Sequence, residues 1–122
     1  MKPLIFVVDD DVFFIKYISS LLSSNSFDNI KSFSDGENCI QNLSQYPDLI
    51  LLDHDMVGMS GREVLKYLRN NNFNIPVVMV SGREEDELIN EVYKLGAKKY
   101  FKKDEFLFKN LKEYLKTNLQ MV

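Results

Sequence analysis

Carboxylate, hydroxyl and amine side chains stand directly after four short segments of this sequence. The segments and the groups that follow them are residues 4–8 with Asp9 and Asp10, residues 50–52 with Asp53, residues 77–80 with Ser81, and residues 98–102 with Lys103. If these segments are parallel strands, their carboxyl ends meet at one edge of a sheet, where open α/β sheets bind their ligands. We therefore expect the five side chains to share one site.

Three of these groups are carboxylates, and carboxylates brought within a few ångströms of one another repel and raise one another's pKa. Such a cluster is stabilised by a cation, and oxygen ligands with room for water suit Mg²⁺. Lys103 adds a fixed positive charge, and Ser81 adds a hydroxyl donor. A divalent ion, an ammonium group and a hydroxyl around Asp53 would bind three phosphoryl oxygens. A carboxylate that accepts a phosphoryl group becomes an acyl phosphate, a known form of covalent catalysis.

The elements that would position these groups follow from the hydrophobic pattern. Uninterrupted runs such as Ile50-Leu51-Leu52 are typical of strands covered on both faces. We expect strands near residues 4–8, 29–33, 49–53, 77–80 and 98–102, and helices near residues 12–25, 34–44, 60–70, 84–95 and 104–119. Five strands alternating with five helices predict an α/β fold, a parallel sheet with helices on both faces.

Local signals mark several helix ends. Ser34 with Glu37, and Ser60 with Glu63, match the Ser-x-x-Glu capping box at a helix start. Asp104 is placed to cap the last helix. Gly96 is placed to end the helix before the fifth strand.

Composition limits the class of protein. The chain has 122 residues, 45% hydrophobic and 27% charged, which is typical of one globular domain covering residues 1–122. A net charge of −3 gives no basic field, which argues against direct binding to nucleic acid. The single Cys39 cannot form an internal disulfide, and neither a membrane-spanning run nor a signal-peptide core stands in the sequence. We expect a soluble cytoplasmic domain with no membrane contact.

With these residues in place, the sequence resembles the receiver domain of bacterial two-component response regulators, including single-domain chemotaxis-type members. The family's Asp-x-x-Met-Pro-x-x-x-Gly signature is similar to residues 53–61, and its Gly-Ala-x-x-Tyr-x-x-Lys segment is similar to residues 96–103. The paired acids after the first strand resemble Asp9 and Asp10, and the strand-end Ser/Thr resembles Ser81. The resemblance covers nearly the whole chain. It implies a doubly wound, flavodoxin-like sheet in the order 2-1-3-4-5.

The resemblance also implies roles for the site residues. Asp53 would accept the phosphoryl group from the phosphohistidine of a sensor kinase or a phosphotransfer protein. Asp10, Asp53 and the backbone carbonyl of Asp55 would bind Mg²⁺, for which Mn²⁺ can substitute, and Asp9 would assist through water. Lys103 would hold the phosphoryl group.

A conformational response is implied as well. Ser81 would move toward the phosphoryl group, and Tyr100 would rotate inward, changing the surface of the fourth helix, fifth strand and fifth helix. Arg83 and Asp55 would flank the path of the attacking water and modulate dephosphorylation. The protein would be a signalling switch rather than an enzyme, a monomer or a phosphorylation-dependent dimer that acts on a downstream protein.

Two positions depart from the family pattern. Val57 stands where the signature has Pro, which we expect to loosen the loop after Asp53 and to do little else. Asp104 stands where a Pro follows the Lys, often through a cis peptide. A cis bond without Pro costs about 3–4 kcal/mol, so this bond is either trans or strained. His54, between the two acids, is expected to face solvent.

Other classes of protein share parts of this pattern. A haloacid-dehalogenase-type phosphatase would use Asp53 as nucleophile and Asp55 as a side-chain acid. In that family further metal-binding acids follow the Lys, whereas in this sequence the paired acids precede all the other motifs. A flavin- or nucleotide-binding module would need a Gly-rich phosphate loop after the first strand, where three acids stand instead. A receiver-shaped docking domain that has lost phosphorylation is supported only by Asp104.

Overall fold

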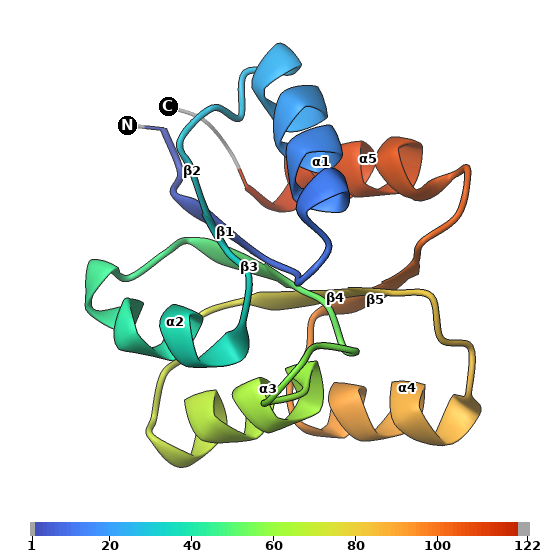
Figure 1. Cartoon of the computed structure of the whole chain (residues 1–122). Coiled ribbons are helices and arrows are strands. Elements are labelled where there is room, and N and C mark those ends of the chain that lie inside the picture. The colour runs from blue at the N-terminus through green and yellow to red at the C-terminus, as the bar shows by residue number, and fades with distance from the viewer. Residues whose placement is uncertain (1, 120–122) are drawn as a thin grey trace.

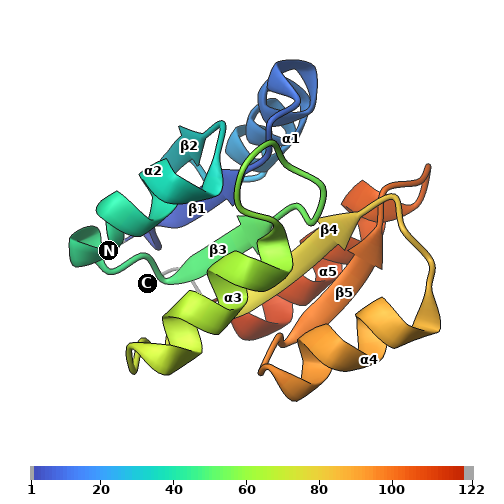
Figure 2. The ribbon, with the colours of Figure 1, turned by 60° about the horizontal axis from the view of Figure 1, so that its bottom comes forward.

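Five parallel strands form a single sheet with helices on both of its faces (Figure 1). The computed structural model describes residues 2–119. Its strands are β1 (Ile5–Val8), β2 (Ile30–Phe33), β3 (Leu49–Leu52), β4 (Val77–Ser81) and β5 (Lys99–Lys102). They lie side by side in the order β2-β1-β3-β4-β5 (Figure 2). The predicted α/β fold and the strand order implied by the family resemblance are both confirmed.

The helices are α1 (Val12–Ser24), α2 (Gly36–Gln41), α3 (Gly61–Asn70), α4 (Asp86–Lys94) and α5 (Leu107–Asn118). Helices α1 and α5 cover one face of the sheet, and α2, α3 and α4 cover the other (Figure 1). A short 3-10 helix, η1 (Leu43–Gln45), follows α2 where the sequence predicted one helix to residue 44. None of the helices within residues 2–119 combines the length and apolar character needed to cross a membrane.

Burial of both faces explains why the central strands are uninterrupted apolar runs. Every residue of β1, β3 and β4 is buried. Successive side chains of a strand point to opposite faces, so Phe6 and Val8 pack toward α2, α3 and α4, while Ile5 and Val7 pack toward α1 and α5. The two cores hold the three central strands rigidly, and their carboxyl ends align because Val8 pairs with Leu52.

The helix starts confirm some predicted caps and correct others. Ser60 and Glu63 form the predicted capping box of α3. The box predicted for Ser34 and Glu37 is wrong: Asp35 is the N-cap of α2, and its carboxylate accepts from the amide of Asn38 at 2.7 Å.

Asp104 also differs from its predicted role as the cap of the last helix. Phe106 is the N-cap of α5, without a side-chain cap. The Asp104 carboxylate accepts from the Phe106 amide at 2.9 Å and so closes the turn before the helix.

Two glycines near these elements occupy positions that other residues would not fit. A Cβ on Gly61 would lie 2.2 Å from the carbonyl oxygen of Asp53, so only glycine lets α3 start directly against the end of β3. The amide of Gly61 donates to the carbonyl of His54 at 2.9 Å and closes the loop between them. Gly96 ends α4 as predicted, with a φ of +93° that favours glycine.

Candidate functional site

The predicted acids converge at the carboxyl edge of the sheet. Asp9, Asp10 and Asp53 each offer a carboxylate oxygen, and these atoms all lie within 4.8 Å of one another. The backbone sets this geometry, since the Asp53 amide donates to the carbonyl of Val8 at 2.9 Å and extends the pairing of β1 with β3. Asp9 and Asp53 are buried, whereas Asp10 is exposed. The cluster therefore opens to solvent on the side of Asp10.

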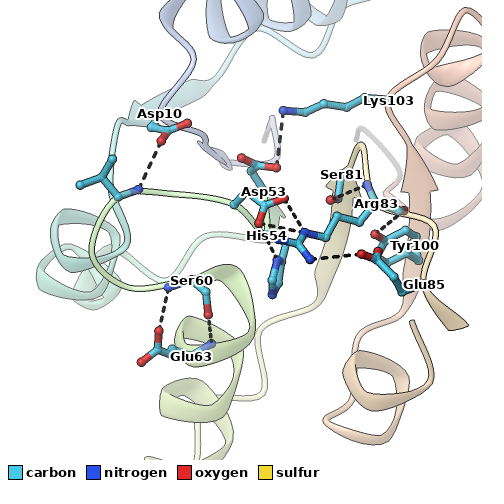
Figure 3. A network of polar contacts seen from close by, with 12 residues as sticks. Asp10, Asp53, His54, Ser60, Glu63, Ser81, Arg83, Glu85, Tyr100 and Lys103 are labelled. Carbon is cyan, nitrogen blue, oxygen red and sulfur yellow. Dashed lines mark hydrogen bonds and ion pairs between the residues drawn. The ribbon is translucent and has the colours of Figure 1, made fainter. Parts of the chain in front are cut away.

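Lys103 lies on the opposite side of the cluster. Its Nζ is 2.6 Å from Asp9 Oδ2. It also lies 3.5 Å from Asp53 Oδ1 (Figure 3). The ammonium also lies 4.3 Å from the ring centroid of Phe14 on α1, within cation–π range. Burial acts to lower the pKa of Lys103, but the hydrogen bond to Asp9 and the charges of Asp53 and Asp9 outweigh it and raise that pKa. Lys103 is therefore a fixed cation at neutral pH.

The Lys103–Asp104 peptide bond is trans, since no cis bond occurs between residues 2 and 119. The Lys103 amide donates to the carbonyl of Ser81 at 2.8 Å, which continues the pairing of β4 with β5. Lys103 thus reaches the carboxylates without the proline that the family pattern has after it.

Asp53 has an unusual electrostatic environment for a carboxylate. Burial, followed by the charge of Asp9, raises its pKa to about 6, although the charge of Lys103 acts in the opposite direction. The ionised form is thus costly to maintain in the free protein. Two buried carboxylates and Asp10 face a single ammonium group, so the site carries an excess of negative charge.

This donor set fits a hard divalent cation. The available ligands are all oxygens, and the exposed side leaves room for water, as Mg²⁺ or Mn²⁺ requires. Asp10 is held in place by the loop after β3, because its Oδ2 accepts from the Val57 amide at 3.2 Å (Figure 3). The expectation that Val57 only loosens this loop is wrong, since a proline at that position would have no N–H to donate.

Ser81 and Tyr100 are linked through the backbone of Arg83. The Ser81 hydroxyl is fully buried and accepts from the Arg83 amide at 3.2 Å. The half-buried Tyr100 donates its hydroxyl proton to the Arg83 carbonyl at 2.8 Å (Figure 3). Burial raises the pKa of Tyr100. Ser81 and Tyr100 are predicted to respond together to phosphorylation, and the hydroxyls of both are bonded to the backbone of Arg83.

Arg83 also forms an ion pair across the site. Its Nε lies 3.0 Å from Asp55 Oδ1 and 2.8 Å from Asp55 Oδ2, which joins the loop after β3 to the loop after β4. The hydrogen bond from Arg83 lowers the pKa of Asp55. The structure thus brings together the two residues predicted to flank the path of water.

His54 is not the solvent-facing residue that we expected. It is buried, and its Nδ1 lies 3.2 Å from Asp55 Oδ1. The close start of α3 at Gly61 covers its backbone. Nothing in the local sequence signals this burial.

Sequence reasoning also missed two supports of the site. Glu37 accepts from the Met59 amide at 2.9 Å and pins the loop after β3 from α2. Phe14 supports Lys103 from α1. Both contacts join residues far apart in the chain, so only the fold reveals them.

Comparison with known proteins gives one consistent result. The family model of the response regulator receiver domain matches residues 5–116. The chain is 30% identical over 102 residues to the chemotaxis protein CheY of Treponema pallidum (strain Nichols), covering 81% of this chain and 71% of that protein. Among other curated relatives, the chain spans 34% and 46% of the length of two transcriptional regulatory proteins.

Solved structures agree with the sequence comparison. The phosphorylated cyanobacterial phytochrome response regulator RcpA superposes with a TM-score of 0.88 at 28% identity, covering 100% of this chain and 97% of that one. The Mn²⁺-bound form of response regulator Rcp1 superposes with a TM-score of 0.85 at 26% identity, covering 98% and 96%.

Proposed function

The chain belongs to the response regulator receiver domain family, whose members accept a phosphoryl group, and we propose that Asp53 is the acceptor. The single observation that carries this assignment is the position of Asp53. It lies at the end of β3, within reach of the Lys103 ammonium and beside the carboxylates of Asp9 and Asp10. The other acids are placed differently: Asp9 is bonded to Lys103 at 2.6 Å, and Asp55 is paired with Arg83.

In the proposed reaction, an Asp53 carboxylate oxygen attacks the phosphorus of a phosphohistidine donor. The new O–P bond forms as the N–P bond breaks, and the electron pair returns to the donor's imidazole, which takes up a proton. Asp9, Asp10 and Asp53 would hold the divalent ion, which supplies charge neutralisation of the phosphoryl oxygens when bound. Lys103 binds one phosphoryl oxygen, and the Ser81 hydroxyl donates to another.

We assign Mg²⁺ to this site, with Mn²⁺ as a substitute. The all-oxygen donor set supports a hard cation, and the Mn²⁺-bound Rcp1 supports a divalent one. The Asp55 carbonyl would complete the protein ligands, as the family resemblance implies. Titration of the metal-free protein with each ion, followed by tyrosine fluorescence or NMR, tests this assignment.

The response to phosphorylation would pass through Arg83. Movement of Ser81 toward the phosphoryl group would break its bond to the Arg83 amide, and the same segment holds Tyr100. Inward rotation of Tyr100 would then change the surface formed by α4, β5 and α5, where a downstream protein would bind. The protein would act as a signalling switch that catalyses its own phosphorylation and slow dephosphorylation.

The donor would be a histidine kinase or a phosphotransfer protein in the cytoplasm. Phe13 on α1 is 83% exposed and follows Asp10 closely in the chain, which supports a protein donor that docks there. Phe13→Ala would slow transfer from a phosphorylated histidine phosphotransfer protein and leave transfer from acetyl phosphate unchanged. Equal slowing with both donors would contradict docking at this residue.

The dehalogenase-type alternative loses support from the structure. That mechanism needs Asp55 as a side-chain acid, but pairing with Arg83 lowers the pKa of Asp55 and keeps it ionised. The experiment that separates the two functions is incubation with Mg²⁺ and acetyl phosphate, followed by intact-protein mass spectrometry and an assay of released phosphate. One phosphoryl group on the wild type, none on Asp53→Asn and slow release support the receiver function. Rapid turnover of phosphomonoesters would contradict it.

A further inference from the structure

The buried imidazole of His54 is a group for which the proposed phosphotransfer reaction has no use. The residue is 8% exposed, and its Nδ1 lies 3.2 Å from Asp55 Oδ1 (Figure 3). Its Nε2 is buried and has no hydrogen-bond partner among the residues that the structure describes. One ring nitrogen is thus bonded to a carboxylate, and the other is bonded to nothing in residues 2–119.

The chemistry of the pair fixes the tautomer of His54. A carboxylate accepts hydrogen bonds and does not donate them, so Nδ1 carries the hydrogen; in the neutral imidazole, Nε2 is then an acceptor without a partner in residues 2–119. Leaving a buried acceptor unpaired is unfavourable, and an apolar side chain of similar size would avoid that cost. Packing alone therefore does not explain a histidine here. What His54 offers beyond an apolar residue is the hydrogen bond to Asp55.

That hydrogen bond lies at one end of a connected series of contacts. His54 bonds to Asp55, and both oxygens of Asp55 accept from Arg83 Nε. The backbone of Arg83 in turn bonds to Ser81 and to Tyr100. The Asp55 side chain is 52% exposed and that of Arg83 is 46% exposed. His54 is the buried member that anchors this exposed ion pair.

We propose that His54 is a positioning residue, which holds the Asp55 carboxylate on Arg83 and thereby slows hydrolysis of the phosphoryl group on Asp53. The inference rests on the proposed function of Asp53. In hydrolysis, the water oxygen attacks phosphorus, the O–P bond to Asp53 breaks, and its electron pair restores the carboxylate. Inorganic phosphate leaves with the oxygen of that water, and the water's protons pass to phosphate and solvent.

The direction of the effect follows from the loops that the ion pair joins. Asp55 lies two residues after Asp53, in the loop after β3. Arg83 lies two residues after Ser81, in the loop after β4. The pair between them spans this side of the site, where it would obstruct an approaching water. Without the bond from His54, Asp55 is held by the exposed Arg83 alone and leaves its position more often. Loss of that bond therefore accelerates loss of the phosphoryl group.

The test compares three substitutions of His54. Leucine removes both nitrogens, asparagine places an amide donor near the position of Nδ1, and glutamine places its amide near that of Nε2. Each variant is phosphorylated with acetyl phosphate and Mg²⁺, the donor is removed, and decay of the adduct is followed by intact-protein mass spectrometry. We expect several-fold faster decay for His54→Leu and His54→Gln, and decay close to wild type for His54→Asn. Equal rates for the leucine and asparagine variants would overturn the proposal.

A background that lacks Asp55 separates positioning from packing. If His54 acts through Asp55, the double variant His54→Leu/Asp55→Ala should lose its phosphoryl group at the same rate as Asp55→Ala alone. The same acceleration in both backgrounds would mean that His54 acts through packing and would overturn the proposal.

A second measurement needs no phosphoryl group. The Arg83 Nε–H signal is followed by NMR in the Mg²⁺-loaded protein, where its slow hydrogen exchange reports the bond to Asp55. We expect protection in the wild type and in His54→Asn, and loss of protection in His54→Leu. Unchanged protection in His54→Leu would overturn the positioning role. Failure of the wild type to form an adduct would instead refute the proposed function of Asp53, so the two failures are distinguishable.

Discussion

Replacement of Asp53 by asparagine should stabilise the metal-free protein at neutral pH. The carboxylate is 7% exposed and lies beside Asp9, and its environment raises its pKa from 3.8 to about 6. The folded protein therefore binds the Asp53 proton more tightly than the unfolded chain does. The stabilising contribution of this tighter proton binding is fully present below pH 4, and it is lost as the pH rises through the window from about 4 to about 6. Asparagine has nearly the same shape and no charge, so it removes this loss.

The size of the effect follows from the pKa difference. Each unit corresponds to about 1.4 kcal/mol, so the ionised Asp53 costs up to about 3 kcal/mol of folding free energy above pH 7. Lys103 keeps its closer bond to Asp9 in the variant, at 2.6 Å, so its ammonium is not left unpaired. For a domain of this size, about 3 kcal/mol corresponds to a rise in melting temperature of roughly 10 °C.

The assay is urea denaturation of the wild type and of Asp53→Asn, in EDTA, at several pH values between 4 and 8. We expect the gap between the two proteins to be largest at pH 7–8 and to close toward pH 4. Excess Mg²⁺ should narrow the gap at pH 7 if it occupies the proposed site, because a ligand of the folded state stabilises the wild type. A variant less stable than the wild type at pH 7, or a gap that is the same at pH 4, would refute the reasoning.

Three further predictions concern other parts of the structure. Val57→Pro removes the N–H that holds Asp10 and should weaken Mg²⁺ binding by about threefold to tenfold. Val57→Ala keeps this N–H and should bind Mg²⁺ as the wild type does. Equal Mg²⁺ affinities of the two variants would contradict the role of this amide. Lys103→Ala should keep most of its Mg²⁺ affinity but lose the change in the Tyr100 NMR signals on phosphorylation, and a wild-type change would show that Lys103 is misassigned. Arg69 donates to four backbone carbonyls, two in the loop between α3 and β4 and two in the loop between α4 and β5. Arg69→Met should therefore lose about 3 kcal/mol of unfolding free energy in urea, and a loss below about 1 kcal/mol would contradict this contribution.

Sequence reasoning predicted which side chains lie close together because burial and topology act over whole segments. An uninterrupted apolar run such as the one before Asp53 indicates a strand covered on both faces. Parallel strands bring their ends together whatever the details of packing. The pattern of the sequence is therefore sufficient to assign Asp9, Asp53 and Ser81 to one edge of the sheet.

What the sequence did not reveal depends on single contacts between distant segments. Ser34 and Asp35 are both good caps, and Asp35 is used because Glu37 is bonded to the Met59 amide instead. The burial of His54 depends on how closely α3 starts at Gly61, which no local pattern indicates. These differences of one residue or one hydrogen bond have little effect on the fold, but they determine the surroundings of the site.

The acceptor assignment is tested most directly by trapping the phosphoryl group where it forms. The protein is incubated with acetyl phosphate and Mg²⁺ and treated with borohydride, which reduces an acyl phosphate to an alcohol, and peptide mapping then locates the reduced side chain. We predict homoserine at Asp53 in a Mg²⁺-dependent reaction, with the other aspartates unchanged. Reduction at Asp9, Asp10 or Asp55, or an unmodified Asp53 in a protein that carries phosphate, would contradict the assignment.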